Sequence, residues 1–271
     1  MSQLDRQSFL GLHSHKRLAE VQVGLIGLGG GGSHVAQQLA HVGVGGFVLV
    51  DPDHIESSNL NRLVGGTHED IAQRRAKTEI AARLIRSINP DVRIEEHVSK
   101  WQEAIERLKC CDLIVGGLDS VIAKDDLDRF CRRFLIPYID MGMDVHTMAG
   151  GRYLIAGQVA LVLPGSPCLR CMGIVTEEGL IAEAQKYGAA GGNPQVVWPN
   201  GLLASAAVGL AVQMICPWND QLGRGALLEY DGNKHTLRPS GLFAHLQAAG
   251  CAHNHPDETG EMLFDIRRHI R

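Results

Sequence analysis

The residues best suited to do chemistry begin with a glycine loop. Gly27, Gly29 and Gly32 form a G-x-G-x-x-G pattern, with Gly30 between them, after an apolar run and before an apolar-periodic segment. Glycines permit a tight strand–helix turn and let phosphates approach bare backbone N–H groups at the helix start. Asp51 ends the next predicted strand, where a carboxylate can bind ribose hydroxyls. The pattern predicts a nucleotide site for either a dinucleotide or ATP; the alternative is a turn that holds no ligand.

The segment after Asp51 favours ATP. It contains SNLNR, which supplies Asn59 and Arg62, and Lys77 follows further on. A dehydrogenase has no chemical reason to place an amide and a cation there, whereas an enzyme that splits ATP needs donors and cations around its phosphates. Asp119 follows a strand end and two glycines, so its carboxylate should point into the crevice and could hold Mg²⁺. The structural alternatives are a helix cap for Asn59, solvated faces for the two cations and a plain turn for Asp119.

These motifs occur together in one known family. The sequence resembles the ThiF/MoeB/HesA family, the bacterial relatives of ubiquitin-activating enzymes, over about residues 1–255. The matching segments, besides Lys77, are 27–62, INP at 88–90, DLIVGGLDS at 112–120 and GQVALVLPGSPCLRC at 157–171. The resemblance implies adenylation of the C-terminal carboxylate of a small ubiquitin-like protein, with ATP and Mg²⁺ as cofactors.

The resemblance also implies the role of each residue. The glycine loop would contact the ATP phosphates, Asp51 would hold the ribose, and Asp119 would serve Mg²⁺ and the geometry of the attacking carboxylate. The triphosphate would be bound by Asn59, Arg62 and Lys77.

Further features of the family concern its partners. Arg6 matches an N-terminal arginine that relatives insert into the partner subunit's ATP site, which implies a homodimer; the alternative is a solvated terminal residue. The acyl-adenylate would pass to a sulfur donor or a conjugating enzyme. Some relatives carry a thioester-forming cysteine at the place of Gly191, but residues 188–193 contain no cysteine, which argues against a covalent step here.

A second set of residues has the spacing of a zinc site. Cys168 and Cys171 form C-x-x-C, as in a zinc knuckle. In the family a second C-x-x-C near the C-terminus closes the site, and Cys251 fits its first position, but an asparagine stands at the second. Either His255 or His253 could replace the missing cysteine, and we prefer His255 because its longer spacing strains the backbone less. A structural Zn²⁺ bound by three cysteines and one histidine is therefore predicted.

Composition narrows the class of protein. The chain has 271 residues, is 45% hydrophobic and carries a net charge of −4, so it lacks the basic footprint of a nucleic-acid-binding protein. Its N-terminus is polar, and its longest apolar stretch, Gly201–Cys216, is flanked by prolines and is typical of a buried helix, which argues against a membrane protein. Seven scattered cysteines do not resemble a disulfide framework, so we expect a cytoplasmic protein.

The first half of the chain alternates strands and helices, which predicts a parallel sheet covered on both faces. Expected strands there are 21–27, 47–50, 92–97, 112–115 and 137–140, with helices at 33–41, 76–88 and 121–134. In the second half we expect strands within 152–163 and at 227–230 and 235–237, a loop over 179–193 and a helix at 201–216. The predicted fold is a Rossmann-like, doubly wound α/β sheet, mostly parallel and extended by antiparallel strands.

Taken with the resemblance, this pattern predicts a single ThiF-type adenylation domain over residues 1–271. It comprises an N-terminal arm (1–20), a nucleotide-binding half (21–150) and a half that binds the substrate tail and zinc (151–271). Two alternatives are adenylation of a small-molecule or tRNA-borne carboxylate and an NAD-dependent oxidoreductase. A third is a scaffold without activity, against which the joint presence of Arg62, Lys77 and Asp119 argues.

Overall fold

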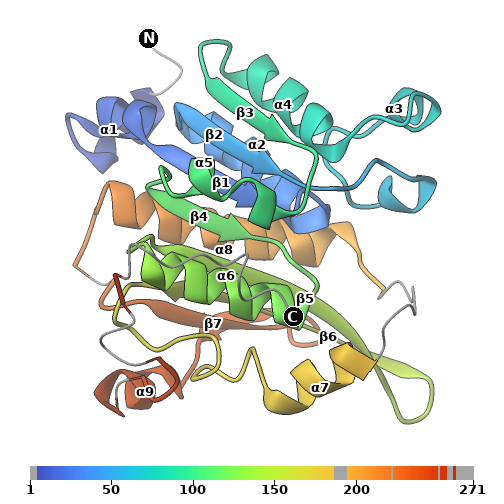
Figure 1. Cartoon of the computed structure of the whole chain (residues 1–271), viewed down its shortest axis with the longest axis vertical. Helices are drawn as coiled ribbons and strands as arrows, with labels where there is room; N and C mark the ends of the chain where they lie inside the picture. Colours follow the sequence, from blue (N-terminus) through green and yellow to red (C-terminus); the bar gives the residue numbers. More distant parts are fainter. Residues whose placement is uncertain (1–4, 186–193, 221, 250, 255–258, 261–271) are drawn as a thin grey trace.

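The computed structural model describes residues 5–185, 194–220, 222–249, 251–254 and 259–260. One eight-stranded sheet runs through the molecule in the order β3-β2-β1-β4-β5-β6-β7-β8 (Figure 1). The strands are β1 (Gln22–Ile26), β2 (Gly46–Val50), β3 (Arg93–His97), β4 (Leu113–Gly116), β5 (Tyr138–Met148), β6 (Arg152–Val162), β7 (Ala226–Asp231) and β8 (Thr236–Pro239). Strands β1 to β5 are parallel and β5 to β8 antiparallel, which confirms the predicted fold class.

Helices cover both faces of the sheet. The α-helices are α1 (Ser14–Glu20), α2 (Gly30–Val42), α3 (His68–Ala72), α4 (Lys77–Ile88), α5 (Ile105–Leu108), α6 (Val121–Arg133), α7 (Glu177–Gln185), α8 (Val197–Ile215) and α9 (Phe243–Ala249). Helices α2, α4 and α8 pack into one hydrophobic core, and α5 and α6 into the other. Both cores are built from the apolar runs of the central strands, which are buried on both faces as parallel strands require.

The strand order places the functional edge. The chain runs from β1 outward to β2 and β3, then returns to the other side of β1 to form β4. Ligands of open α/β sheets bind where the strand order reverses, beyond the carboxyl ends of the strands. Here that point lies between Gly27 after β1 and Gly117 after β4.

Three predicted elements differ from the structure. Residues 177–185 form helix α7, where a loop over 179–193 was predicted, because EEGLIAEAQ has good helix formers that its flanking glycines obscured; residues 186–193 lie outside the described part. Helix α8 begins at Val197, four residues early, since Pro199 is tolerated in a first turn. Strand β5 continues to Met148, eight residues past the predicted end at Asp140, because pairing with β6 overrides its mixed sequence.

Helix α8 is the one described helix long and apolar enough to cross a membrane by length and composition. Half of its apolar window is buried inside the fold, where the helix packs on α2, β5 and β6. It is therefore a core helix, as the sequence predicted for this apolar stretch.

Candidate active site

The glycine loop can pack against its neighbours only because glycine has no side chain. Gly27 has a φ of +82°, and a Cβ there would lie 2.5 Å from the Gly117 carbonyl oxygen. A Cβ on Gly32 would lie 1.9 Å from the Gly27 carbonyl oxygen, so these two glycines permit the close packing of β1, α2 and the end of β4. A Cβ on Gly29, by contrast, would meet no atom within 4 Å. The loop is thus tight against the protein and open at Gly29.

The open side of the loop presents a helix N-terminus. Gly29 is the N-cap of α2, has no side chain to cap it, and the first turn holds no acidic residue. Among the described residues, no acceptor takes the backbone N–H groups of residues 30–32. Unpaired amides and the positive end of the helix dipole together favour a phosphate here.

The other helix start at this edge is already capped. The Glu183 carboxylate of α7 accepts the backbone N–H groups of Val121 and Ile122 at 2.6 and 3.2 Å, and also the Ser120 hydroxyl. A carboxylate at a helix start satisfies the same groups that a phosphate would. The N-terminus of α2, and not that of α6, is therefore the open anion site.

The Asp51 carboxylate binds the main chain of the glycine loop. Its carboxylate accepts the Leu28 N–H at 2.6 Å and the Asp53 N–H at 2.8 Å. Burial raises the pKa of this carboxyl, against the opposing effects of the Lys77 charge and these two N–H donors. Each carboxylate oxygen keeps a lone pair for a further donor, so the predicted contact with a ribose stays open to Asp51.

Of the two predicted cations, Arg62 lies against the glycine loop, and Lys77 lies beside the acidic residues Asp51 and Asp53. The Arg62 side chain runs over Gly30, with its Cδ 3.2 Å from the position that a Cβ of Gly30 would take. Its Nη1 donates to the Ser58 carbonyl at 2.6 Å and to the Asn61 side chain at 2.9 Å. Lys77 begins α4, and its Nζ lies 2.7 Å from the Asp53 carboxylate.

Asn59 has a structural role in this arrangement. Its side-chain oxygen accepts the Glu56 N–H at 3.0 Å, which is the helix cap that the sequence offered as the alternative. The cap stabilises the short turn η2 (Ser57–Asn59) that carries Arg62 to the loop. Its predicted contact with the triphosphate stays a prediction.

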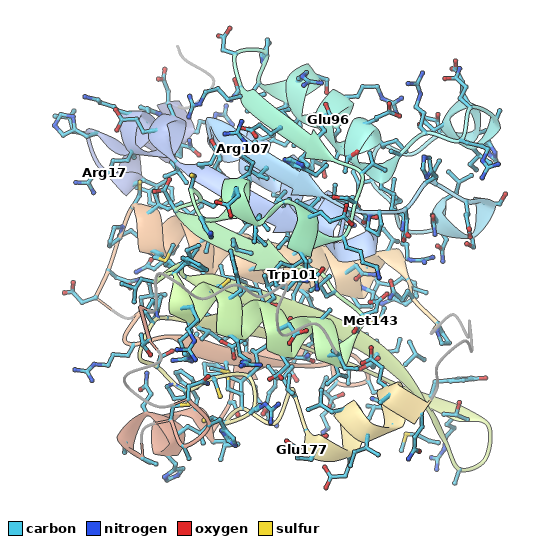
Figure 2. All side chains as sticks on the ribbon, in the orientation of Figure 1. Arg17, Glu96, Trp101, Arg107, Met143 and Glu177 are labelled. Carbon is cyan, nitrogen blue, oxygen red and sulfur yellow. The ribbon has the colours of Figure 1, made fainter. Side chains whose placement is uncertain are left out.

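A cavity of about 390 Å³ opens beside the loop on the α6 side of the sheet. Ile26, Val50, Trp101, Leu118 and Ile122 give it an apolar lining; Trp101 is labelled in Figure 2. Its size and lining are typical of a small-molecule pocket with few polar groups. It adjoins Gly27 and Pro52, next to Asp51, so a purine could lie here while its phosphates reach α2.

Asp119 lies on the opposite side of the loop, at a polar channel. Gly29, Asp119, Met143 and Gln195 line the part of the channel next to the loop, of about 50 Å³. Asp119 and Gln195 also line its continuation, of about 90 Å³, together with Lys124. The side-chain nitrogen of Gln195 donates to the Asp119 carboxylate at 3.2 Å, so a bound Mg²⁺ or substrate would displace this contact.

A buried ion pair forms the floor of this channel. The Lys124 Nζ donates to both oxygens of Asp140 at 2.8 Å and to the Met141 carbonyl at 3.3 Å. The Tyr138 hydroxyl donates to the same carboxylate at 3.0 Å. Burial, with the Asp140 charge beside it, raises the pKa of Tyr138.

Breaking this pair should destabilise the fold. Asp140 is fully buried, so Lys124→Met leaves a buried carboxylate without an opposite charge, and we expect a loss of about 3–5 kcal/mol in the free energy of unfolding. Chemical denaturation would measure it. The double variant Lys124→Met, Asp140→Asn should recover at least half of the loss, because no charge remains. A single variant as stable as the parent chain would contradict the assignment.

Arg6 does not reach the site of its own chain. It lies exposed in η1 (Asp5–Leu10), where the neighbouring Gln7 donates to the Val42 carbonyl at the C-terminal end of α2. The glycine loop lies at the other end of this 13-residue helix, roughly 20 Å away at 1.5 Å per residue. Within one chain Arg6 is therefore a surface residue.

The predicted zinc ligands come together. Cys168, Cys171, Cys251 and His253 offer four ligand atoms within 4.8 Å of one another. Sulfur–sulfur distances are 3.6 and 3.7 Å, and the His253 Nδ1 lies 3.3 and 3.7 Å from two sulfurs. A tetrahedral Zn²⁺ with Zn–S bonds of 2.3 Å and Zn–N bonds of 2.0 Å needs edges of about 3.8 and 3.5 Å. The cluster fits a closed, structural zinc site.

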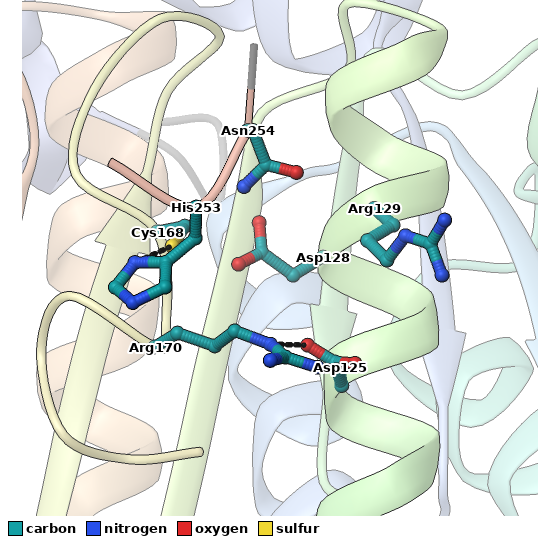
Figure 3. A pocket seen from close by; sticks show the side chains of 7 residues that line it. All are labelled: Asp125, Asp128, Arg129, Cys168, Arg170, His253 and Asn254. Atoms are coloured by element: carbon teal, nitrogen blue, oxygen red, sulfur yellow. Dashed lines mark hydrogen bonds and ion pairs between the residues drawn. The ribbon is translucent and has the colours of Figure 1, made fainter. Parts of the chain in front are cut away.

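The fourth member of the cluster is His253, the second choice from the sequence. The preferred residue, His255, lies outside the described part of the chain. A histidine side chain is longer than that of cysteine, so Nδ1 reaches the cluster even from the short C-x-H spacing. Asn254 instead donates to the Cys251 sulfur at 3.7 Å, and Figure 3 shows it with His253 and Cys168 around a cavity of about 280 Å³.

We predict that His253→Ala removes the zinc and lowers the melting temperature by about 10 °C or more, since 1 kcal/mol is worth about 2–4 °C in a domain of this size. His255→Ala, the matched control, should keep the bound zinc and the melting temperature of the parent chain. Metal content per chain and thermal unfolding would measure this. Loss of zinc in the control alone would transfer the ligand to His255.

Several residues of the site carry no signal in the sequence. Gln195, Lys124 and the β5 residues Met141 and Met143 line the channel but belong to no recognisable motif. Glu183 caps α6 from 61 to 63 residues away along the chain. Lys124 and Asp140 are 16 residues apart in the sequence, and nothing in this separation indicates that they form an ion pair.

Comparison with known proteins concerns the family and the fold of the chain. A model of the ThiF family matches residues 2–250. The SAMP-activating enzyme E1 of Haloferax volcanii is 33% identical over 177 residues, 63% of this chain and 62% of that protein. The tRNA threonylcarbamoyladenosine dehydratase of Escherichia coli K12 is 32% identical over 146 residues, 51% and 54% of the two chains. The match thus spans less than two thirds of each relative.

Among solved structures, the crystal structure of E. coli MccB with ATP has a TM-score of 0.71 to this chain at 19% identity. It covers 90% of this chain and 72% of that one. This likeness concerns the fold, which it supports over nearly the whole chain.

Proposed function

Because the chain belongs to the ThiF family, we propose that it transfers AMP from ATP to the C-terminal carboxylate of a small ubiquitin-like protein. The observation that carries the proposal is the open start of α2, with Arg62 on one side and the Asp119 channel on the other. The pocket beside Trp101 would take the adenine, and the channel would bring in the carboxylate.

The reaction follows from this placement. A carboxylate oxygen attacks the α-phosphorus in line, a new O–P bond forms, and the bond between the α-phosphorus and the pyrophosphate oxygen breaks. No general base is needed, because the nucleophile is ionised at neutral pH. The α2 amides, Arg62 and Lys77 would stabilise the charge that develops on the phosphates, and positioning supplies the rest. Mg²⁺, held by Asp119, would neutralise part of the phosphate charge.

Arg6 fits this proposal through a second copy of the chain. An exposed arginine that cannot reach its own glycine loop is free to reach that of a partner in a homodimer. The zinc cluster would be structural, because its four ligands leave no open position.

ATP–pyrophosphate exchange tests the proposal. Small ubiquitin-like proteins with a free C-terminal Gly-Gly should drive exchange, and mass spectrometry should find AMP on their last residue. The same proteins with a C-terminal carboxamide are the matched control and should drive none. Exchange with tRNA or a small acid alone would transfer the activity to another carboxylate, and tighter binding of NAD than of ATP would contradict adenylation.

A further inference from the structure

Strand β5 has an open edge beside the channel. Its first three pairs with β4 end at Gly116↔Asp140, and β4 then turns away at Gly117. Strand β5 continues for eight more residues, to Met148, paired on one side only, with β6. In Figure 1 this part of β5 runs outward in the hairpin next to α7. No strand of the described part of the chain therefore pairs with this edge of β5 beyond Asp140.

The hydrogen bonds between β4 and β5 show which main-chain groups of β5 face this side. The Pro137 carbonyl accepts the Ile114 N–H of β4, and main-chain groups alternate between the two edges of a strand. Odd-numbered residues of β5 therefore face β4 and the space beyond it. The Met141 carbonyl agrees with this alternation, because it accepts Lys124 rather than β6. Met143 and Val145 are the next two residues on this edge.

The main-chain groups of Met143 and Val145 on this edge have no partner among the described residues. Proteins normally cover or blunt such an edge, because it is a template for another strand. Here it does not face bulk solvent alone: Met141, Met143 and Asp144 line the channel that ends at Asp119 and the glycine loop. Figure 2 labels Met143 on this part of β5.

We propose that the open edge of β5 at Met143 and Val145 binds the C-terminal tail of the substrate protein as an added antiparallel β-strand. This rests on the proposed function and specifies how its substrate is recognised. The tail enters from the hairpin side and its carboxylate ends at Gly117 and Asp119, so it runs opposite to β5. Main-chain bonds to Met143 and Val145 supply the affinity, as in other cases of strand addition.

The channel also restricts the tail's side chains. In a strand, successive side chains point to opposite faces. One face of the added strand meets Met143 and Leu203, and the other meets Gln158 and Lys124. The narrowness of the channel near Asp119 admits only small residues in the last positions, whereas residues further out are less confined.

The test separates the main chain from the side chain of Val145. Val145→Pro removes the N–H on the open edge and leaves the bonds to β6, which belong to even-numbered residues. Val145→Ala, the matched control, keeps the N–H. The probe is a pool of synthetic octapeptides with free Gly-Gly C-termini, at millimolar concentration. We expect Val145→Pro to raise the KM for the peptides in exchange at least tenfold, with the KM for ATP and the melting temperature unchanged, and Val145→Ala to change either KM less than threefold.

Hydrogen exchange gives a readout that does not need turnover. With a non-hydrolysable ATP analogue and the peptide pool, the amides of Met143 and Val145 should become protected, while those of Asp144 and His146, already paired with β6, should change little. Protection of these two amides without pyrophosphate exchange would support the added strand and contradict adenylation. Pyrophosphate exchange with no protection at Met143 and Val145, or with equal KM in both variants, would overturn the strand and leave the proposed function standing. If the amides stayed unprotected and no pyrophosphate exchange occurred, both the added strand and the proposed function would be overturned.

Discussion

Arg62→Ala should reduce ATP–pyrophosphate exchange by about 10²–10³-fold, the usual cost of removing one preorganised donor from a developing charge. Arg62 is the cation that packs directly on the glycine loop, over Gly30, and it is held there through Ser58 and Asn61. The leaving pyrophosphate has no other described arginine that packs on this loop. The change should act mainly on kcat, because the charge is largest in the transition state.

Two variants make this result specific. Arg62→Lys keeps the charge but loses the planar fork, and we expect an intermediate loss. Arg86→Ala removes an exposed arginine of α4 that pairs with Glu96, away from the loop, and should leave exchange within twofold. Nucleotide binding and thermal unfolding should be nearly unchanged in all three. Exchange by Arg62→Ala within twofold of the parent chain would exclude this residue from catalysis.

Gly29→Ala should fold normally and bind ATP at least about tenfold more weakly, which is roughly 1.4 kcal/mol. The backbone of Gly29 has a φ of −71° and a ψ of −148°, and a Cβ there would meet no protein atom within 4 Å, so the added methyl group clashes with no part of the chain. The space that the methyl group enters is the open side of the loop, where a phosphate would approach the amides. Calorimetric titration with ATP and thermal unfolding would measure both parts.

Two other glycines serve as controls for this result. Gly209→Ala, inside α8, also meets no atom within 4 Å; it should leave ATP affinity unchanged and raise stability by about 0.5–1 kcal/mol, because alanine is the better helix former. Gly32→Ala should instead destabilise the fold, because its Cβ would lie 1.9 Å from a backbone oxygen. We expect a loss of about 3 kcal/mol or more in stability. Unchanged ATP affinity in Gly29→Ala would mean that phosphates bind elsewhere.

The predictions for Arg62 and Gly29 and the proposed strand on β5 concern three parts of one site. The start of α2 binds phosphates, Arg62 acts on the leaving group, and the β5 edge delivers the carboxylate. The buried pair of Lys124 and Asp140 connects them, because Lys124 holds the Met141 carbonyl at the point where the open edge begins. Its charge is compensated by Asp140, so its main contribution is to position β5.

The sequence alone determined the parts that depend on local pattern. Apolar runs and prolines predicted the parallel strands and most helices within a few residues, and the glycine spacing predicted the loop between β1 and α2. Cys168 and Cys171 were recognisable as ligands because two thiolates at C-x-x-C spacing suit zinc, and the family resemblance implied Cys251 as the third ligand. The acid and the cations of the site could be named since each follows a strand end or a short motif.

Only the tertiary structure decided how these pieces meet. The fourth zinc position depends on how far a side chain reaches across the fold, which is why His253 occupies it in the described chain. The extension of β5 to Met148 follows from pairing with β6, since a strand of mixed sequence is stabilised by its neighbour and not by its own pattern. The Glu183 cap and the pair of Lys124 with Asp140 join residues 63 and 16 positions apart, through contacts that no local pattern encodes.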